Sequence, residues 1–138
     1  MDITPIDPEF VRVWRRVRGE DAPDVLADAL AGEVQRRRDY LRLNFQSEAA
    51  DCLARCRTLR ALGFVHDGAW PPLPRCPART YESRSDAVRA LWHEETDCAG
   101  QYRQWADQTG APEQKLAFAR CARSCERTAN RLWRRLEG

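Results

Sequence analysis

Apolar side chains recur every three or four residues in four long stretches of the chain, the spacing of an amphipathic helix. The clearest stretch is LWHEETDCAGQYRQWA, residues 91–106, whose apolar face also includes Glu95. No stretch shows the strict alternation of a half-buried strand. The pattern predicts long helices over four ranges: 24–44, 47–68, 83–108 and 112–136.

The segments between these stretches contain helix-breaking and helix-capping residues. Residues 69–82, AWPPLPRCPARTYE, hold four prolines and are expected to be a non-helical crossover. Ser83, with Asp86 three residues later, resembles a capping box at the start of the third long helix. Residues 1–23 are expected to form a short lid helix, beginning at Asp7-Pro8-Glu9, and a linker. The chain therefore reads as one all-α domain, a four-helix bundle over residues 1–138.

Composition narrows the expected partners and compartment. The chain has 138 residues, 32% of them charged, and a net charge of only +2, as expected of a globular domain with a core. Arginine clusters such as 36–38 and 134–135 lie beside acids or near helix ends, which favours solvated faces over a nucleic-acid patch. No apolar run has membrane-spanning length, and the N-terminus is acidic rather than leader-like. We therefore expect a cytoplasmic protein with reduced thiols that binds neither nucleic acid nor membrane, and we leave a homodimer open.

The two halves of the chain repeat one pattern of polar and sulfur-containing residues. Glu33 precedes Tyr40 by seven residues, and Glu95 precedes a tyrosine by the same interval. The second helix of each half then carries two cysteines four residues apart. These residues are Cys52 and Cys56 in the first half, and Cys121 and Cys125 in the second. The chain thus reads as two similar helical hairpins joined by the crossover.

A duplicated hairpin with a long crossover resembles the ferritin-like and rubrerythrin-like superfamily, over roughly residues 24–137. In that family, one glutamate from each of two helices and an E-x-x-H motif from each of the other two bind a di-iron centre. Glu33 and Glu95 match the two single glutamates, but neither His66 nor His93 has a glutamate three residues before it. The resemblance implies a ferritin-like fold with an altered or lost di-metal site. A rubrerythrin-like di-iron oxidoreductase with unusual ligands is the alternative.

Glu33 and Glu95 are candidate metal ligands because an unpaired carboxylate on an apolar helix face is costly. The competing interpretation is a buried carboxylate that is protonated or paired with an arginine such as Arg36 or Arg55. Their tyrosine neighbours are expected to be core aromatics whose hydroxyls bond the glutamates. Both interpretations place the two glutamates opposite each other in the core.

The cysteines are a second set of candidate ligands, with thiophilic Cu(I) or Zn as the metal. The candidates are Cys52, Cys56, Cys98, Cys121 and Cys125. The favoured interpretation is that they are small apolar side chains that fill the core, and redox disulfides are a third interpretation. Cys76, in the crossover, is expected to be an exposed thiol. The tryptophans are expected to be core or lid residues: Trp14, Trp70, Trp92, Trp105 and Trp133.

Motifs that would indicate an enzyme are missing from the sequence. No glycine-rich phosphate loop, nucleophile elbow or paired zinc ribbon occurs. The sequence therefore favours a metal-binding or structural and interaction module over an enzyme. A Cu(I)- or Zn-handling thiol protein is a further alternative.

Overall fold

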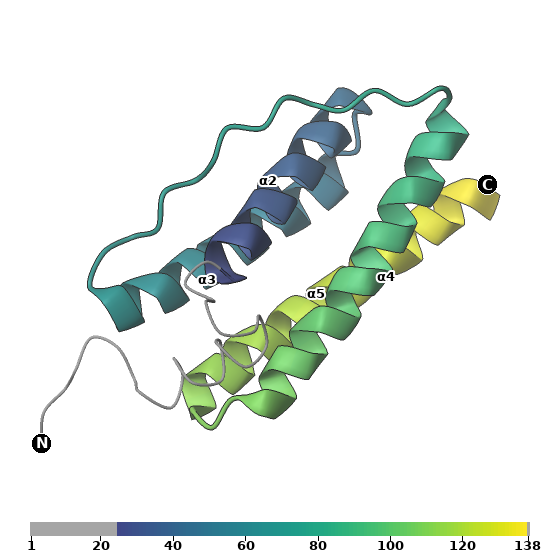
Figure 1. The fold of residues 1–138 in the computed structure, drawn as a ribbon. Coiled ribbons are helices and arrows are strands. Elements are labelled where there is room, and N and C mark those ends of the chain that lie inside the picture. Colours follow the sequence, from purple (N-terminus) through teal and green to yellow (C-terminus); the bar gives the residue numbers. More distant parts are fainter. Residues whose placement is uncertain (1–24, 138) are drawn as a thin grey trace, which may run out of the picture.

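The computed structural model describes residues 25–137, which form four helices and contain no strand (Figure 1). The four predicted helices are therefore confirmed, with boundaries within about two residues of those expected. The lid helix expected within residues 1–23 lies outside the described part of the chain. The helices are α2 (Val25–Arg42), α3 (Gln46–Asp67), α4 (Arg84–Gln108) and α5 (Pro112–Glu137).

The helix ends follow from local chemistry. The Ser83 hydroxyl accepts a hydrogen bond from the backbone N–H of Asp86 at 3.0 Å, so the predicted cap of α4 is confirmed. Gly68 ends α3 in the left-handed conformation, with φ of 73°, where a side chain would be strained. Asn44 takes φ of 64° in the tight turn between α2 and α3. These short signals explain why the helix boundaries could be predicted.

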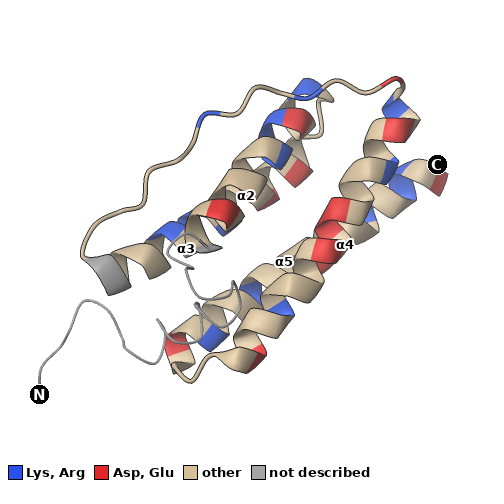
Figure 2. Cartoon of the chain, viewed as in Figure 1, with Lys and Arg blue, Asp and Glu red and all other residues tan. Residues whose placement is uncertain are grey.

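The helices pack as two antiparallel hairpins, α2 with α3 and α4 with α5, and α3 also packs on α5. The crossover from α3 to α4 runs back along the whole length of the first hairpin (Figure 1). Because of this return, α4 starts at the end of the bundle where α3 also starts, and the two helices run in the same direction. Acidic and basic residues occur along all four helices (Figure 2). None of the four described helices combines the length and the apolar character that a membrane span requires.

Three contacts one helical turn apart hold the crossover against α2. The Cys76 thiol lies 3.9 Å from the carbonyl oxygen of Ala31, and Gln35 Nε2 donates to the carbonyl of Pro77 at 2.7 Å. Asp39 is buried and accepts from both the backbone N–H and the side chain of Arg79, at 2.7 Å and 2.8 Å. This spacing of four residues puts the three α2 positions on one helix face. The crossover is therefore fixed in place despite lacking secondary structure.

The crossover packs closely against α3 at Gly63. A Cβ atom at Gly63 would lie 2.4 Å from Cγ of Pro71 and 2.9 Å from a methyl group of Leu26. Such distances are well inside van der Waals contact. The absence of a side chain at this position is what lets the crossover leave α3 in its observed direction.

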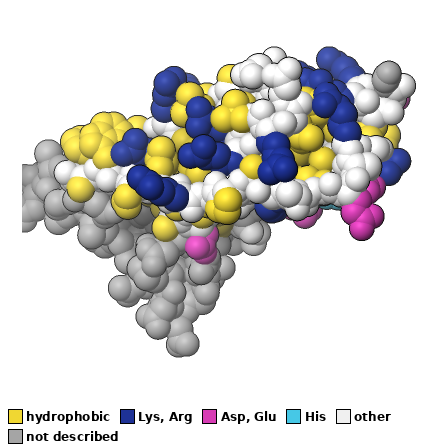
Figure 3. Space-filling view, turned by 90° about the horizontal axis from the view of Figure 1, so that it is seen from above, with side chains coloured by type: hydrophobic (Ala, Val, Ile, Leu, Met, Phe, Trp, Pro, Cys, Tyr) yellow, Lys and Arg dark blue, Asp and Glu magenta, His cyan; other side chains and the backbone are white. Residues whose placement is uncertain are grey.

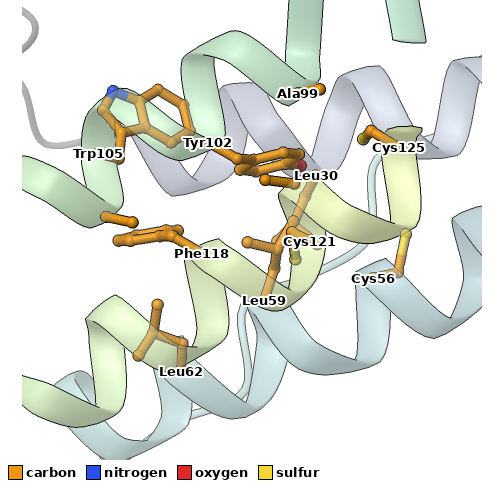
Figure 4. Packing of buried hydrophobic residues seen from close by; sticks show 12 residues of the cluster. Leu30, Cys56, Leu59, Leu62, Ala99, Tyr102, Trp105, Phe118, Cys121 and Cys125 are labelled. Atoms are coloured by element: carbon orange, nitrogen blue, oxygen red, sulfur yellow. The ribbon is translucent and has the colours of Figure 1, made fainter. Parts of the chain in front are cut away.

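The core has two apolar clusters, one toward each end of the bundle. The first contains Leu30, Leu59, Leu62, Tyr102, Trp105 and Phe118 among others, and is drawn in Figure 4. The second contains Tyr40, Phe45, Leu91 and Leu132 among others. On each helix, at least one buried polar residue lies between the residues that belong to the first cluster and those that belong to the second. A polar layer therefore separates the two apolar clusters.

Two of the tryptophans for which a place in the core was predicted lie at the surface instead. Trp70 is 54% exposed and Trp133 is 48% exposed, so neither is a core residue. Trp70 lies on the crossover and stacks on Phe64, with ring centroids 4.7 Å apart. Trp133 packs at the surface of α5 against Trp92. Of the others, Trp105 is buried, Trp92 is half-buried, and Trp14 lies outside the described residues.

Candidate functional site

The polar layer of the core is built around Arg55, a fully buried residue of α3. Its Nε donates to Glu33 Oε1 at 2.9 Å, and its Nη2 lies 2.9 Å from both carboxylate oxygens of Glu95. The two glutamates belong to α2 and α4 and are themselves fully buried. One guanidinium therefore bridges the two carboxylates that the sequence predicted to face each other, and that prediction is confirmed.

Arg36 of α2 supplies a second cation to the same pair. Its Nη2 lies 2.8 Å from Glu33 Oε2, and its Nε lies 3.5 Å from Glu95 Oε2. With Arg55, this makes two positive charges against two negative charges in a space closed to solvent. A buried ion cluster is tolerable only when its charges balance and its hydrogen-bonding groups are satisfied.

The two tyrosines add a hydrogen bond to each glutamate, and each does so across the two hairpins. The Tyr40 hydroxyl of α2 donates to Glu95 Oε2 of α4 at 2.6 Å. The Tyr102 hydroxyl of α4 donates to Glu33 Oε2 of α2 at 2.8 Å. Each tyrosine thus bonds the glutamate of the other hairpin, as expected of two similar hairpins packed about a common axis. The predicted role of both hydroxyls is confirmed.

Helix α5 contributes hydroxyl groups rather than charges to this layer. Arg55 Nη1 donates to Ser124 Oγ at 2.8 Å and to Thr128 Oγ1 at 3.2 Å. Thr128 in turn donates to Asp51 Oδ2 at 2.8 Å, and Asp51 forms an ion pair with Arg131 nearer the surface. Side chains of the other three helices therefore hold Arg55 in one orientation. We call Glu33, Arg36, Tyr40, Arg55, Glu95, Tyr102, Ser124 and Thr128 the central cluster.

The repeat shows why the cations come from one hairpin. Arg36 follows Glu33 by three residues, and the residue three after Glu95 is Cys98. Arg55 follows Cys52 by three residues, and the matching residue of the second hairpin is Ser124. The second hairpin thus carries small side chains where the first carries arginines. Four arginines would overfill and overcharge this space, whereas two neutralise it.

Burial and charge act in opposite directions on the ionisation of the cluster. Burial raises the pKa of Glu33, but Arg36 and Arg55 outweigh it and hold that pKa below its usual value. Burial lowers the pKa of Arg55, but the two glutamates more than compensate, so its pKa rises well above the usual value. Burial raises the pKa of Tyr40 and Tyr102, and the adjacent carboxylates raise it further. Near neutral pH, the arginines and Glu33 are therefore charged and the tyrosines are protonated.

The predicted cysteine ligands are divided among different parts of the core. Cys52 lies in the central layer, with its sulfur 3.3 Å from Arg55 Nη2 and 4.0 Å from Glu95 Oε2. Cys56, Cys121 and Cys125 belong to the first apolar cluster (Figure 4), and Cys98 is a half-buried neighbour of it.

Ionisation of these thiols is opposed by the apolar surroundings. Burial is the main reason that the pKa of Cys56 rises to about 11 and that of Cys121 to about 12. Burial likewise raises the pKa of Cys52 and Cys125 far above the usual value. All of them are free cysteines, as is Cys76, which is half-buried rather than exposed as predicted.

The residues of the central layer do not fit a pair of iron ions. All four carboxylate oxygens of Glu33 and Glu95 already contact a guanidinium, a tyrosine hydroxyl or both. The neighbouring positions on α3 and α5 supply an arginine and two hydroxyls, which are poor iron ligands, and the Cys52 thiol, whose pKa burial raises far above its usual value. Within residues 25–137, no group of three or more His, Cys, Asp or Glu side chains is arranged to hold a metal ion.

Sequence reasoning missed the α5 side of this site. Arg36 and Arg55 were predicted as alternative partners of the glutamates, whereas in the structure both arginines pair with the glutamates at once. Ser124 and Thr128 gave no signal of their own, because hydroxyl side chains are common on half-apolar helix faces. The available clue to Arg55 was its position on the same helix face as Cys52 and Leu59, because a charged residue is rarely buried unless it is paired.

Comparison of the chain with models of protein families, with characterised proteins and with solved structures found no match.

Proposed function

We propose that this chain is a ferritin-like bundle in which two arginines take the place of a di-metal centre, and that it acts as a structural and interaction module rather than as an enzyme. The order of the helices, the long crossover and the repeated glutamate–tyrosine pattern support the ferritin-like assignment. The charge balance of the central cluster supports the loss of the metal. Two guanidiniums balance the charge of the two carboxylates without a metal ion.

The observation that carries this proposal is the position of Arg55. Its guanidinium contacts both carboxylates at 2.9 Å and is held by side chains from α5. A metal ion could reach the glutamates only by displacing this group and leaving a buried cation without partners. The carboxylates of the site are engaged by guanidinium and hydroxyl groups of the same cluster, and this mutual pairing supports a stabilising role.

A second candidate function is binding of a thiophilic metal, Cu(I) or Zn, by the core cysteines. The observation in its favour is that Cys56, Cys121 and Cys125 lie in one apolar cluster. Against it stands the cost of ionising these thiols where they are buried, a cost that a bound metal would have to offset.

Metal content and metal-dependent stability test these alternatives. Protein purified without chelator should contain no stoichiometric metal, and its melting temperature should not change with Fe(II), Zn or Cu(I) under reducing conditions. A ligand that binds the native state must raise that temperature by mass action. Two irons per chain would overturn the proposal in favour of the di-iron oxidoreductase. Stabilisation by zinc or copper that is lost in Cys56→Ala/Cys121→Ala would instead favour the thiol site.

A further inference from the structure

The groove between α2 and the crossover is lined by arginines and apolar side chains. It opens at one point into a hollow of about 630 Å³. The residues that line this hollow are Arg38, Leu41, Arg75, Cys76, Pro77 and Ala78. A second hollow, of about 380 Å³, follows toward the start of α4 and includes Arg42 and Arg84 in its lining. We call the two hollows together the α2–crossover seam.

The seam carries cations that the described residues do not neutralise. Arg38, Arg42 and Arg75 form no ion pair within residues 25–137, and all three are exposed. The acid in the groove, Asp39, is buried and already engaged by Arg79. Glu82, at the far end, is the other acid that lines it. The seam therefore presents a net positive charge.

Apolar side chains are interleaved with these cations. Leu41, between Arg38 and Arg42 on α2, is 37% exposed, and Leu73, two residues before Arg75, is 42% exposed. Seen from above in the space-filling view, basic and apolar side chains alternate over this side of the molecule, with few acids (Figure 3). Arginine combined with exposed apolar surface is typical of the central part of protein–protein interfaces.

We propose that the α2–crossover seam binds an acidic segment of a partner protein that also carries apolar side chains. Carboxylates of the segment pair with Arg38 and Arg75 in the first hollow and with Arg42 in the second, and an apolar side chain covers Leu41. Arg38 and Arg42 are one turn apart on α2, about 6 Å. Alternate residues of an extended segment are separated by nearly the same distance, about 7 Å. Acids two residues apart therefore match the seam.

The apolar lining argues for a protein segment over a nucleic acid. A phosphate backbone is bound mainly through cations and hydrogen-bond donors, and its affinity does not need leucine and proline contacts. This inference names the partner of the interaction module proposed above, but it does not depend on the state of the central cluster. A metal found in the core would refute the proposed function and leave the binding result unchanged.

The test is binding of a fluorescein-labelled peptide of glutamate, serine and leucine to the full chain, followed by fluorescence anisotropy. Companion peptides replace the glutamates by glutamine or the leucines by serine. The variant Arg38→Gln/Arg75→Gln is compared with Arg120→Gln/Arg127→Gln, which removes the same charge from exposed positions of α5. Alkylation of Cys76, followed by mass spectrometry, reports whether the peptide covers the first hollow.

We expect saturable binding that weakens with salt and is reduced by either peptide change. The seam variant loses two exposed charge contacts, each near the upper end of the usual strength of such contacts, so its Kd should rise about tenfold. The α5 variant should leave the Kd nearly unchanged. Bound peptide should slow the alkylation of Cys76. The proposal is overturned if both variants weaken binding equally, if Cys76 is not protected, or if no binding saturates. It is also overturned if single-stranded RNA or phosphatidylserine vesicles bind more tightly through the same arginines.

Discussion

Replacement of Arg55 by methionine removes the cation that bridges Glu33 and Glu95 while keeping a side chain of similar length. Glu33 then retains its contacts to Arg36 at 2.8 Å and to Tyr102 at 2.8 Å. Glu95 retains a tyrosine hydroxyl, but its nearest guanidinium atom lies 3.5 Å away. Two buried carboxylates would share one cation, so one negative charge would be left without compensation. Breaking a buried ion pair in this way costs about 3–5 kcal/mol.

Urea denaturation followed by circular dichroism measures this loss. Because a domain of this size is stable by roughly 5–15 kcal/mol, Arg55→Met should remove a large share of the total. Arg57→Met is the matched control, an exposed arginine two residues along α3, and should change the free energy of unfolding by at most about 0.5 kcal/mol. Arg55→Met/Glu95→Gln, which removes the excess charge, should recover part of the loss.

The pH dependence separates lost charge compensation from lost packing. Without Arg55, one carboxyl pKa in the folded protein rises above the unfolded value. A group shifted upward contributes stability below its unfolded pKa and loses that contribution as the pH rises. The difference between Arg55→Met and the native chain should therefore shrink as the pH falls from neutral toward the usual glutamate value of 4.5. A loss below about 1 kcal/mol, or one that does not change with pH, would refute the charge-compensation argument.

Three further predictions concern the rest of the bundle. Gly63→Ala should destabilise the fold by about 1–3 kcal/mol, because its methyl group clashes with the crossover, whereas Gly100→Ala, in open space on α4, should stabilise the fold by up to about 1 kcal/mol. Equal effects of the two substitutions in thermal melts would contradict the close approach at Gly63. Cys52→Ala/Cys125→Ala should lower the free energy of unfolding by about 1 kcal/mol for each residue, as for lost packing, and a metal-dependent difference would disprove that role. The native chain should lose stability as the pH falls below 4.5, because the pKa of Glu33 is lower in the folded state than in the unfolded chain, so the unfolded chain takes up the proton at a higher pH. An acid titration without this decline would refute the depressed pKa.

Within residues 25–137, the sequence by itself determined the number, length and boundaries of the helices. Periodic apolar positions define a buried face, and Ser83, Gly68 and the prolines act within a few residues of their own positions. The repeat also determined that Glu33 and Glu95 occupy equivalent places in two hairpins. These are local properties, or comparisons between local patterns, and they need no knowledge of which helices touch.

Tertiary packing alone decided what surrounds the two glutamates. A helix face shows that a carboxylate is buried, but it does not show which helix lies opposite or at which height. Arg55 meets Ser124, 69 residues away, because α3 packs on α5, and Tyr40 meets Glu95 because the hairpins pack crosswise. The same limit explains Trp70, whose large apolar ring suggested the core, whereas the path of the crossover holds it at the surface. Periodicity determines which side of a helix turns inward, and the packing of one helix against another determines the chemistry found there.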